Sequence, residues 1–414
     1  MSVCNMNRKI LFLTHQFFPN HITGTEKLTL TTSQYLQKIG YDPVVVTYSP
    51  SEPFQSFTGF TDGCYFNEYI YEGIRVISFR AANETPDLSG RIHLEYVDDF
   101  AQMILEQEKP ALVHAMHMMR VGTFLLVAKR LGIPYGLSLT DYWMVCHKAQ
   151  MIRDNGELCG GCDEGRNCLA NCGGLAPDYY AKRYAASREI LKDSSFNMVS
   201  SGFLQHVFNL CIDDFVSTYI PYGLDYSYIA PKIQPHINGS GIRFGFIGTL
   251  SEHKGIQVLL NAIPHVQDHA CKFFIYGDGP MRGEVEALAK TDPRVEYRGL
   301  YQKGDTLEVF ANIDVALVVS LWYENSPLIL QELMASTIPV IASNIGSLPE
   351  LVTGGVDGFL IKPGNDKELA KVITSICNNP KILNDLKKNL MKLPRTTIEQ
   401  QCFGIVELYE EMLG

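Results

Sequence analysis

The sequence lacks the long apolar segment that a membrane-spanning helix needs. No stretch approaches roughly 18 consecutive apolar residues, and the apolar patch in residues 1–8 is too short for a signal-peptide core. A basic excess is also missing, since 35 lysines and arginines stand against 45 acidic residues and the net charge is −10. Because a phosphate backbone is recognised by a basic face, this balance argues against a nucleic-acid partner. We expect a cytoplasmic protein, and peripheral association at the inner face of a membrane stays open.

The sequence has no internal repeat and no low-complexity tract, and its 414 residues fit two domains of about 200 residues each. Short apolar segments alternate with helical ones, beginning with a strand at Lys9–Thr14 and a helix that starts near Glu26. Such alternation predicts an α/β fold with parallel, doubly wound sheets. Residues from Ala230 to Gly241, with two prolines, two glycines and no periodicity, predict the linker.

A strand that runs directly into a helix carries the first functional signal. Val315–Val319 predicts a buried strand, and after a short loop Asn325 and Ser326 offer N-cap side chains with Pro327 at the first helical position. A helix N-terminus at the carboxyl edge of a sheet presents free N–H groups and the positive end of the helix dipole. We therefore expect an anion to bind there.

Glu332 lies about one turn inside the same helix, and its side chain tilts back toward the helix start. A carboxylate would repel a phosphate, so we expect it to accept hydrogen bonds from two hydroxyls of a sugar, as in the ribose of a nucleotide. The alternative is a capped helix whose glutamates face solvent.

Glu324 and Glu332 form an E-x(7)-E pair, and the segments Pro339–Val352 and Asp357–Gly364 follow it. Together these segments resemble the C-terminal signature of retaining, nucleotide-sugar-dependent glycosyltransferases of group one (family four). The resemblance extends over nearly the whole chain. It implies the GT-B fold, in which two Rossmann-like doubly wound parallel-sheet domains face a cleft. The implied parts are an acceptor-side domain at 1–225, a donor-binding domain at 226–395 and, at 396–414, a C-terminal helix packing back on the first domain.

The resemblance also implies a donor site. The family carries a pair of glycines after its first strand; here Gly24 is one of them and Thr23 replaces the other. Gly277 and Asp278 belong to a loop that lies near the nucleobase in the family. Lys254 follows a buried strand and would reach the diphosphate, although Thr249 replaces the arginine that usually acts with it. The predicted donor-binding residues are Gly24, Lys254, Gly277, Asp278, Asn325, Ser326, Pro327, Leu328 and Glu332.

The expected reaction is retaining transfer of a hexose or related sugar from a nucleotide-diphosphate sugar to a polysaccharide, lipid-linked glycan or small acceptor. A lysine and helix N–H groups can stabilise the departing diphosphate without a catalytic metal. Glu324 would lie near the donor sugar. Thr140 stands where many relatives carry a histidine, so we expect Asp141 and His117 to activate the acceptor, although His114 and His117 could equally be packed histidines. The alternative function is a nucleotide-sugar-binding scaffold or sensor without turnover.

A cysteine-rich insertion interrupts the pattern at residues 141–177. Five thiols have the spacing C-x(12)-C-x(2)-C-x(5)-C-x(3)-C, in a chain for which we expect no disulfide framework. A Cys-x-x-Cys turn is typical of half a tetrahedral zinc site, and four thiolates also suit an iron–sulfur cluster. Reduced, unliganded thiols are the remaining alternative. The predicted structural metal ligands are Cys146, Cys159, Cys162, Cys168 and Cys172.

Overall fold

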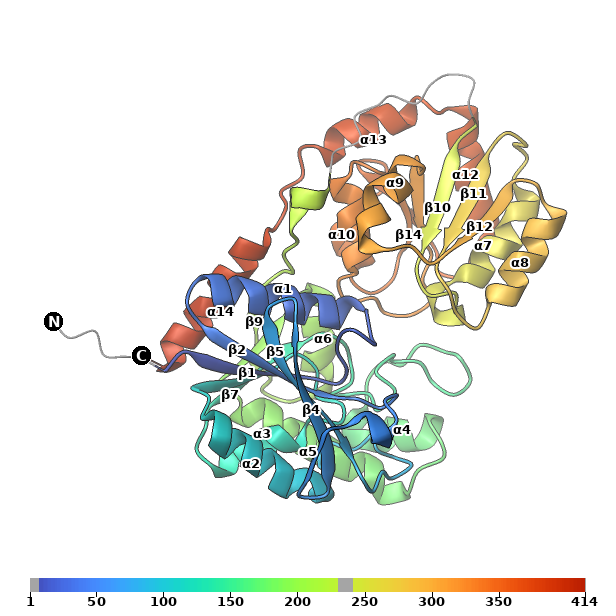
Figure 1. The fold of residues 1–414 in the computed structure, drawn as a ribbon. Helices are drawn as coiled ribbons and strands as arrows, with labels where there is room; N and C mark the ends of the chain where they lie inside the picture. The colour runs from blue at the N-terminus through green and yellow to red at the C-terminus, as the bar shows by residue number, and fades with distance from the viewer. Residues whose placement is uncertain (1–6, 230–240, 414) are drawn as a thin grey trace. The chain divides into compact units, whose positions relative to one another are not determined.

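The structure, a computed structural model, describes residues 7–229 and 241–413 (Figure 1). The predicted linker lies outside the described residues except for Gly241. The chain divides into two compact units: the first runs through Gly223 and takes in Ile398–Gly414, and the second is Leu224–Thr397. Each unit has its own sheet with parallel strands, so the predicted fold class of two Rossmann-like α/β domains is confirmed.

The sheet of the first unit has the strand order β3-β4-β5-β2-β1-β6-β7-β8-β9 among the described residues. In this order every neighbouring pair from β5 to β9, including β2 and β1, is parallel. Strand β4 pairs antiparallel with both β3 and β5. The sequence did not predict this antiparallel edge. The strands are β1 (Lys9–Thr14), β2 (Asp42–Tyr48), β3 (Gly59–Thr61), β4 (Cys64–Tyr71), β5 (Ile74–Ala81), β6 (Leu112–Ala115), β7 (Tyr135–Leu139), β8 (Phe196–Val199) and β9 (Thr218–Tyr219).

The α-helices of this unit connect the strands and cover the sheet. They are α1 (Gly24–Lys38), α2 (Asp98–Glu108), α3 (Thr123–Arg130), α4 (Arg166–Asn171), α5 (Pro177–Asp193), α6 (Gly202–Cys211) and α14 (Ile398–Leu413). Helix α14 joins the core through Tyr409, which is fully buried and whose hydroxyl lies 2.6 Å from Nδ1 of His114 in β6. The other nitrogen of His114 lies 2.7 Å from the Ser138 hydroxyl. Burial lowers the pKa of His114 to about 3, so this histidine is a neutral packing residue.

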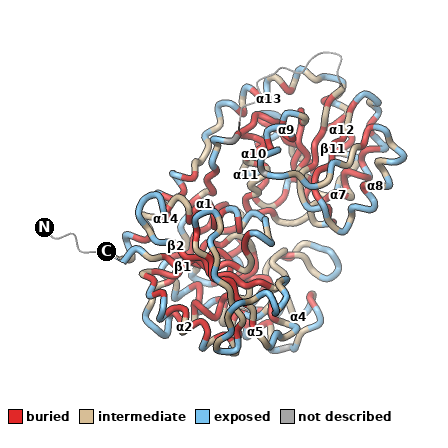
Figure 2. Tube along the Cα trace, viewed as in Figure 1, coloured by how far each residue is buried: buried red, intermediate tan, exposed pale blue. Residues whose placement is uncertain are grey.

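The second unit has a fully parallel sheet in the order β12-β11-β10-β13-β14-β15. Its strands are β10 (Arg243–Ile247), β11 (Lys272–Tyr276), β12 (Val295–Gly299), β13 (Val315–Val318), β14 (Val340–Ser343) and β15 (Gly358–Ile361). Its α-helices are α7 (Ile256–Ala262), α8 (Arg282–Thr291), α9 (Thr306–Ala311), α10 (Leu328–Ala335), α11 (Leu348–Leu351), α12 (Asp366–Asn378) and α13 (Ile382–Leu390). The core follows these short apolar strands, and buried residues trace the sheets of both units (Figure 2).

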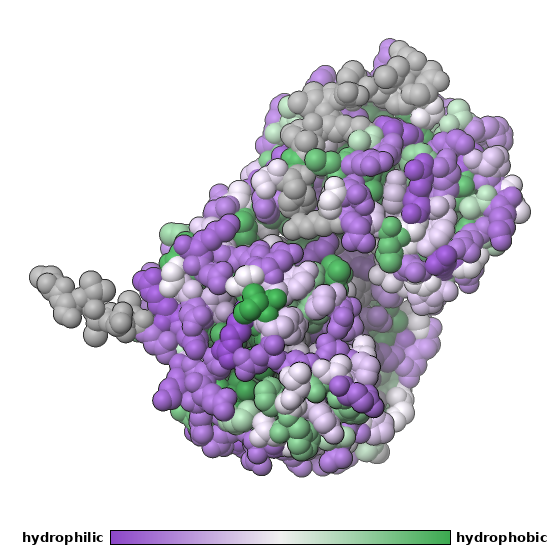
Figure 3. All heavy atoms as spheres, in the orientation of Figure 1, coloured by the Kyte–Doolittle hydropathy of each residue, from purple (hydrophilic) through white to green (hydrophobic). Residues whose placement is uncertain are grey.

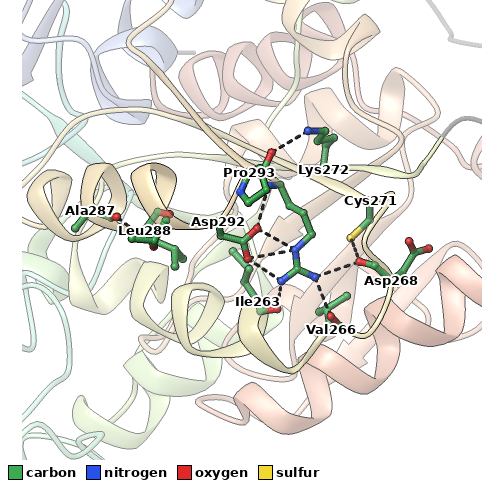
Figure 4. A network of polar contacts seen from close by, with 11 residues as sticks. Ile263, Val266, Asp268, Cys271, Lys272, Ala287, Leu288, Asp292 and Pro293 are labelled. Carbon is green, nitrogen blue, oxygen red and sulfur yellow. Dashed lines mark hydrogen bonds and ion pairs between the residues drawn. The ribbon is translucent and has the colours of Figure 1, made fainter.

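A buried arginine fixes the segments around β11 and β12. Arg294 is 7% exposed, and its guanidinium donates to the Asp292 carboxylate at 2.7 Å and to the carbonyls of Val266 and Ile263 at 2.8 Å each (Figure 4). The carboxylate pairs with the charge that burial would otherwise penalise. The network therefore ties the loop before β11 to the turn before β12.

The visible face of the molecule is mostly hydrophilic, with small separate hydrophobic patches (Figure 3). Within residues 7–229 and 241–413, no helix combines the length and the apolar character required to cross a membrane.

Candidate active site

Four loops of the second unit meet at the carboxyl ends of β10, β11, β13 and β14. The amide of Leu250, after β10, donates to the carbonyl of Asp278, after β11, at 3.0 Å. Leu321, after β13, donates to the carbonyl of His253 at 2.9 Å, and Ser347, after β14, donates to the carbonyl of Glu324 at 3.0 Å. The predicted donor-site loops therefore lie at the edge where open α/β sheets bind ligands.

Two glycines permit this close loop packing. Gly255 has φ +75°, and a Cβ there would lie 1.8 Å from the carbonyl oxygen of Val319. Gly277, predicted from the sequence as a donor-site residue, has φ +134°, and a Cβ would lie 1.9 Å from the carbonyl oxygen of Gly248. Only glycine combines this backbone conformation with so close an approach.

Lys254 and Glu324, both predicted site residues, form an ion pair with Nζ–Oε1 at 2.7 Å. The same carboxylate oxygen accepts from Ser320 Oγ at 2.7 Å and from Trp322 Nε1 at 2.8 Å. The indole also lies under the lysine, whose Nζ is 4.7 Å from the ring centroid. Sequence reasoning did not select Ser320 or Trp322, because nothing in the segment shows that its loop folds around Glu324.

The Glu324 residue is 5% exposed, while the Lys254 side chain is 27% exposed. Burial alone would raise the pKa of Glu324, but the Lys254 ammonium and the hydrogen bonds of Lys254, Ser320 and Trp322 outweigh burial and lower it. The pair therefore presents its cation toward solvent and its carboxylate toward the protein.

The predicted start of α10 is wrong by one residue. Pro327 is the N-cap and Leu328 the first helical residue, because Pro327 has ψ 117°, outside the helical range. Asn325 and Ser326 are buried in the preceding loop, and neither caps the helix at the N-cap position. Glu332 is 7% exposed inside α10. In the loop after β11, Asp278 is exposed and accepts from the amide of Gly279 at 2.8 Å.

In the first unit, Gly24 is the exposed first residue of α1, behind a capping box in which the Thr23 amide donates to Glu26 at 2.6 Å. This geometry leaves the helix start well formed despite the single glycine. Thr140, which follows β7, donates its hydroxyl to the carbonyl of Met116, which follows β6, at 3.1 Å. Its hydroxyl is thus engaged by the backbone of the neighbouring strand end.

His117 and Asp141 are brought together, with His117 Nε2 at 2.9 Å from Asp141 Oδ2. They follow β6 and β7, which are adjacent and parallel, so both lie at the carboxyl edge of the sheet. His15, after β1, packs against His117 with ring centroids 4.0 Å apart and the rings tilted by 37°. Burial lowers the pKa of His15 well below its ordinary value, and His117 adds to the effect. Sequence reasoning missed His15, although it directly follows the first strand.

The predicted cysteines lie in the insertion as free thiols, four of them buried and Cys168 half-buried. A sixth thiol joins them from α6, since the amide of Cys162 donates to Cys211 Sγ at 3.5 Å. Hydrogen bonding with the Cys211 thiol lowers the pKa of Cys162. Cys211 lies 49 residues beyond Cys162, so the spacing in the sequence gives no sign of it.

A small cavity of about 10 Å³ opens inside this insertion, lined among others by Cys162, Cys168, His147 and Arg183. Arg183 is 8% exposed, donates to the carbonyls of Gly90, Met144 and Trp143, and lies 4.5 Å from the indole ring of Trp143. In the part of the chain that is described, no three or more His, Cys, Asp or Glu side chains have the arrangement of a metal site.

Comparison with known proteins supports a glycosyltransferase-like second unit. Residues 241–379 match the family described as glycosyl transferases group 1. An uncharacterized glycosyltransferase of Methanocaldococcus jannaschii, MJ1607, is 30% identical over 179 residues, which are 41% of this chain and 45% of that protein. The chain thus spans about half the length of the curated relatives it matches.

Solved structures are similar over the whole chain at low identity. Anabaena Alr3699/HepE in complex with UDP and glucose has a TM-score of 0.69 at 17% identity, covering 98% of this chain and 100% of that one. Sucrose-phosphate synthase from Thermosynechococcus elongatus has a TM-score of 0.70 at 18% identity, covering 98% and 99%. These likenesses establish the shared two-domain fold.

Proposed function

We propose that this protein is a retaining glycosyltransferase that moves a sugar from a nucleotide-diphosphate sugar to a polysaccharide, lipid-linked glycan or small acceptor. The observation that carries the proposal is the Lys254–Glu324 pair at the carboxyl edge of the second sheet, within the segment that matches group 1 glycosyl transferases. Alr3699/HepE, which has the same fold, was crystallised with UDP and with UDP-glucose. In our proposal the second unit holds the donor, and the first unit, with the C-terminal helix, receives the acceptor.

In this proposal Lys254 contacts the diphosphate and stabilises the charge that develops as it leaves. Glu324 is buried beneath the lysine and engaged by three donors, so it acts through Lys254 and is a positioning residue. This differs from the sequence-based hypothesis that Glu324 lies near the donor sugar. Glu332 would accept from the ribose hydroxyls, and the loop of Gly277 and Asp278 would lie near the nucleobase.

We also propose that the thiols of the insertion, with Cys211, bind a structural zinc ion or an iron–sulfur cluster. The support is Arg183, a buried cation whose contacts among the described residues are carbonyl oxygens, the Tyr179 side chain and an indole ring, with no carboxylate. A buried charge needs a compensating charge nearby. Four thiolates around a divalent ion carry a net charge of −2 and would supply it.

Calorimetry with a panel of UDP-, ADP- and GDP-sugars, followed by measurement of nucleotide release on adding candidate acceptors, tests the enzymatic proposal. We expect one donor to bind and its nucleoside diphosphate to be released only when an acceptor is present. Binding without release for every acceptor would instead favour a nucleotide-sugar-binding scaffold. Absence of binding by the whole panel would contradict both functions.

A further inference from the structure

Arg120, in the loop after β6 of the first unit, is a half-buried cation. Its guanidinium donates to Ser89 Oγ, from Nη2 at 2.9 Å and from Nε at 3.2 Å. The Tyr48 ring lies beside it, with its centroid 5.9 Å from Cζ. In the described parts of the chain, no carboxylate lies within ion-pair distance of this guanidinium.

The charge of Arg120 is not neutralised from a longer distance either. Burial lowers the pKa of Arg120, and the attraction of Tyr48 and Glu84 only partly offsets this effect. Glu84 is already paired, because its two oxygens accept from Nε and Nη2 of Arg80 at 2.9 Å each. Arg120 thus carries a partly desolvated charge, a condition that is costly without a compensating charge.

The backbone of Arg120 is also unusual. Its φ is +67°, in the left-handed region that residues with a Cβ rarely adopt. Such conformations persist where the surrounding structure imposes them, and they cluster at binding and active sites. The strained backbone and the unpaired guanidinium therefore point to the same residue.

The loops around Arg120 meet at one edge of the first sheet. They follow β1, β5 and β6, which run parallel to one another through β2. Ser89 connects them further, since its carbonyl accepts from Trp143 Nε1 at 2.9 Å, and the Trp143 ring lies 6.0 Å from the ring of His117. This is the carboxyl edge, where open α/β sheets bind ligands.

Two histidines of the loop after β1 belong to the same group. The rings of His15 and His117 are 4.0 Å apart. Burial lowers the pKa of His15 well below its ordinary value. His117, Arg120 and His21 lower this pKa further, which requires that they lie near His15. The edge therefore gathers four side chains that can carry positive charge.

Each histidine of this loop has a ring nitrogen without a partner. Nδ1 of His15 and Nε2 of His21 are buried and have no hydrogen-bond partner among the described residues. Buried polar atoms in proteins are normally hydrogen-bonded. A protonated imidazole donates from both nitrogens, and a neutral one donates from either. Two such groups beside a guanidinium suit an anionic ligand.

Two carboxylates of the same loops are held by protein groups. Glu26 is buried, and its Oε1 lies 3.8 Å from His15 Nε2. Asp141 accepts from the amide of Trp143 at 2.8 Å and lies 2.9 Å from His117 Nε2. The guanidinium of Arg120, in contrast, has only a hydroxyl oxygen as a polar partner and remains available to an anion.

We infer that the first unit holds the acceptor through an anionic group, a phosphate ester or a carboxylate, bound by Arg120 with His15 and His21. The inference rests on the proposed sugar transfer and concerns the acceptor alone. A guanidinium presents its N–H groups as a planar fork that matches two oxygens of such a group. The acceptor class is then an acidic or phosphorylated sugar or polyol.

Histidine ring ¹⁵N NMR with three matched sugars tests this site. Glucose 6-phosphate and glucuronic acid carry an anion, whereas glucose carries none. At least one anionic sugar should shift the signals of His15 and His21, assigned by their loss in His15→Asn and His21→Asn, at a concentration at which glucose does not. His93, which contacts Asp98 at 2.8 Å elsewhere in the first unit, should not shift. Equal shifts with glucose, or no shift with either anionic sugar, would overturn the inference.

Arg120→Gln removes the charge and keeps a side chain that can donate a hydrogen bond. Titration of the histidine signals should show at least about tenfold weaker binding of the anionic sugar in this variant. Arg130→Gln is the matched control, because Arg130 pairs with Asp98 at 2.9 Å on the surface of the same unit, and it should bind like the parent. Parent-like affinity in Arg120→Gln would contradict the assignment. If Arg120→Gln does not fold, as judged by circular dichroism, the shifts in the parent still decide.

A nucleoside diphosphate is also an anion, so its binding separates an acceptor site from a donor site. The affinity of Arg120→Gln for UDP, ADP or GDP, whichever binds the parent, should be unchanged. A loss as large as that for the anionic sugar would assign Arg120 to the donor diphosphate and overturn the inference. If the parent transfers no sugar, the proposed function fails, whereas the histidine shifts still decide whether the first unit binds an anion.

Discussion

Replacing Lys254 by methionine should have two separable effects, one on stability and one on nucleotide binding. Lys254→Met keeps a similar side-chain length but leaves the buried Glu324 carboxylate without its cation. Removing one partner of a buried pair costs about 3–5 kcal/mol, and Lys254 is 27% exposed. We therefore expect the lower end, about 3 kcal/mol, because solvent screens the pair in part. Loss of one charge-assisted contact to the diphosphate should cost about 2 kcal/mol, or roughly 30-fold in Kd.

The double variant Lys254→Met/Glu324→Gln tests this reasoning. Removing the stranded charge should restore most of the lost stability, while UDP, ADP or GDP, whichever binds the parent, should still bind weakly. Urea unfolding measures the first effect and calorimetry the second. Lys388→Met is the control, since Lys388 pairs with Asp385 at 3.1 Å on the surface of the same unit. This variant should change neither the free energy of unfolding nor the nucleotide affinity. Parent-like nucleotide affinity in the double variant would refute the role given to Lys254.

Three further outcomes are expected. Glu332→Gln should weaken nucleotide binding by about 2–4 kcal/mol with an unchanged melting temperature, and unchanged calorimetric affinity would remove Glu332 from the donor site. Elemental analysis and visible spectra of anaerobically purified protein should show about one zinc per chain or an iron–sulfur absorption. The metal content should fall in Cys211→Ser but not in the control Cys64→Ser, which changes a buried thiol elsewhere in the chain. Absence of metal, with every thiol open to labelling, would leave only reduced thiols. The Arg294 hydrogen bonds lower the pKa of Asp292, so the stabilisation they give is complete above the ordinary aspartate pKa of about 3.9 and is lost as pH falls through the lower folded value. Urea unfolding at a series of pH values should show this decrease in the free energy of unfolding of the parent at acid pH. An equal decrease in Arg294→Ala would contradict it.

Most of the parallel sheet could be predicted because its strands are short apolar runs. Lys9–Thr14 has the bounds that the sequence suggests, and the strand predicted at Val315–Val319 ends one residue earlier, at Val318. The hairpin of β3 and β4 was missed because β4 lies near the sheet edge and its residues are mostly half-buried or exposed, which removes the continuous apolar signal.

The site could be predicted in part. The loops after the strands were found because parallel strands end at one edge, which places Lys254 and Glu324 near each other. The role of Glu324 could not be found from sequence, since it depends on burial and on contacts from Ser320 and Trp322. The contact of the Met119 amide with His117 Nδ1 likewise depends on a backbone direction that no residue pattern records.

The central claim is that the second unit binds a nucleotide sugar through Lys254. Thermal unfolding of the parent and of Lys254→Ala with a panel of nucleotide sugars tests it most directly, because a ligand that binds only the folded state raises Tm. At a concentration 100 times Kd the stabilisation is about 2.7 kcal/mol. We predict that at least one nucleotide sugar raises the Tm of the parent and that the same concentration raises the Tm of Lys254→Ala much less. No shift with any nucleotide sugar, or an equal shift in both proteins, would contradict the claim.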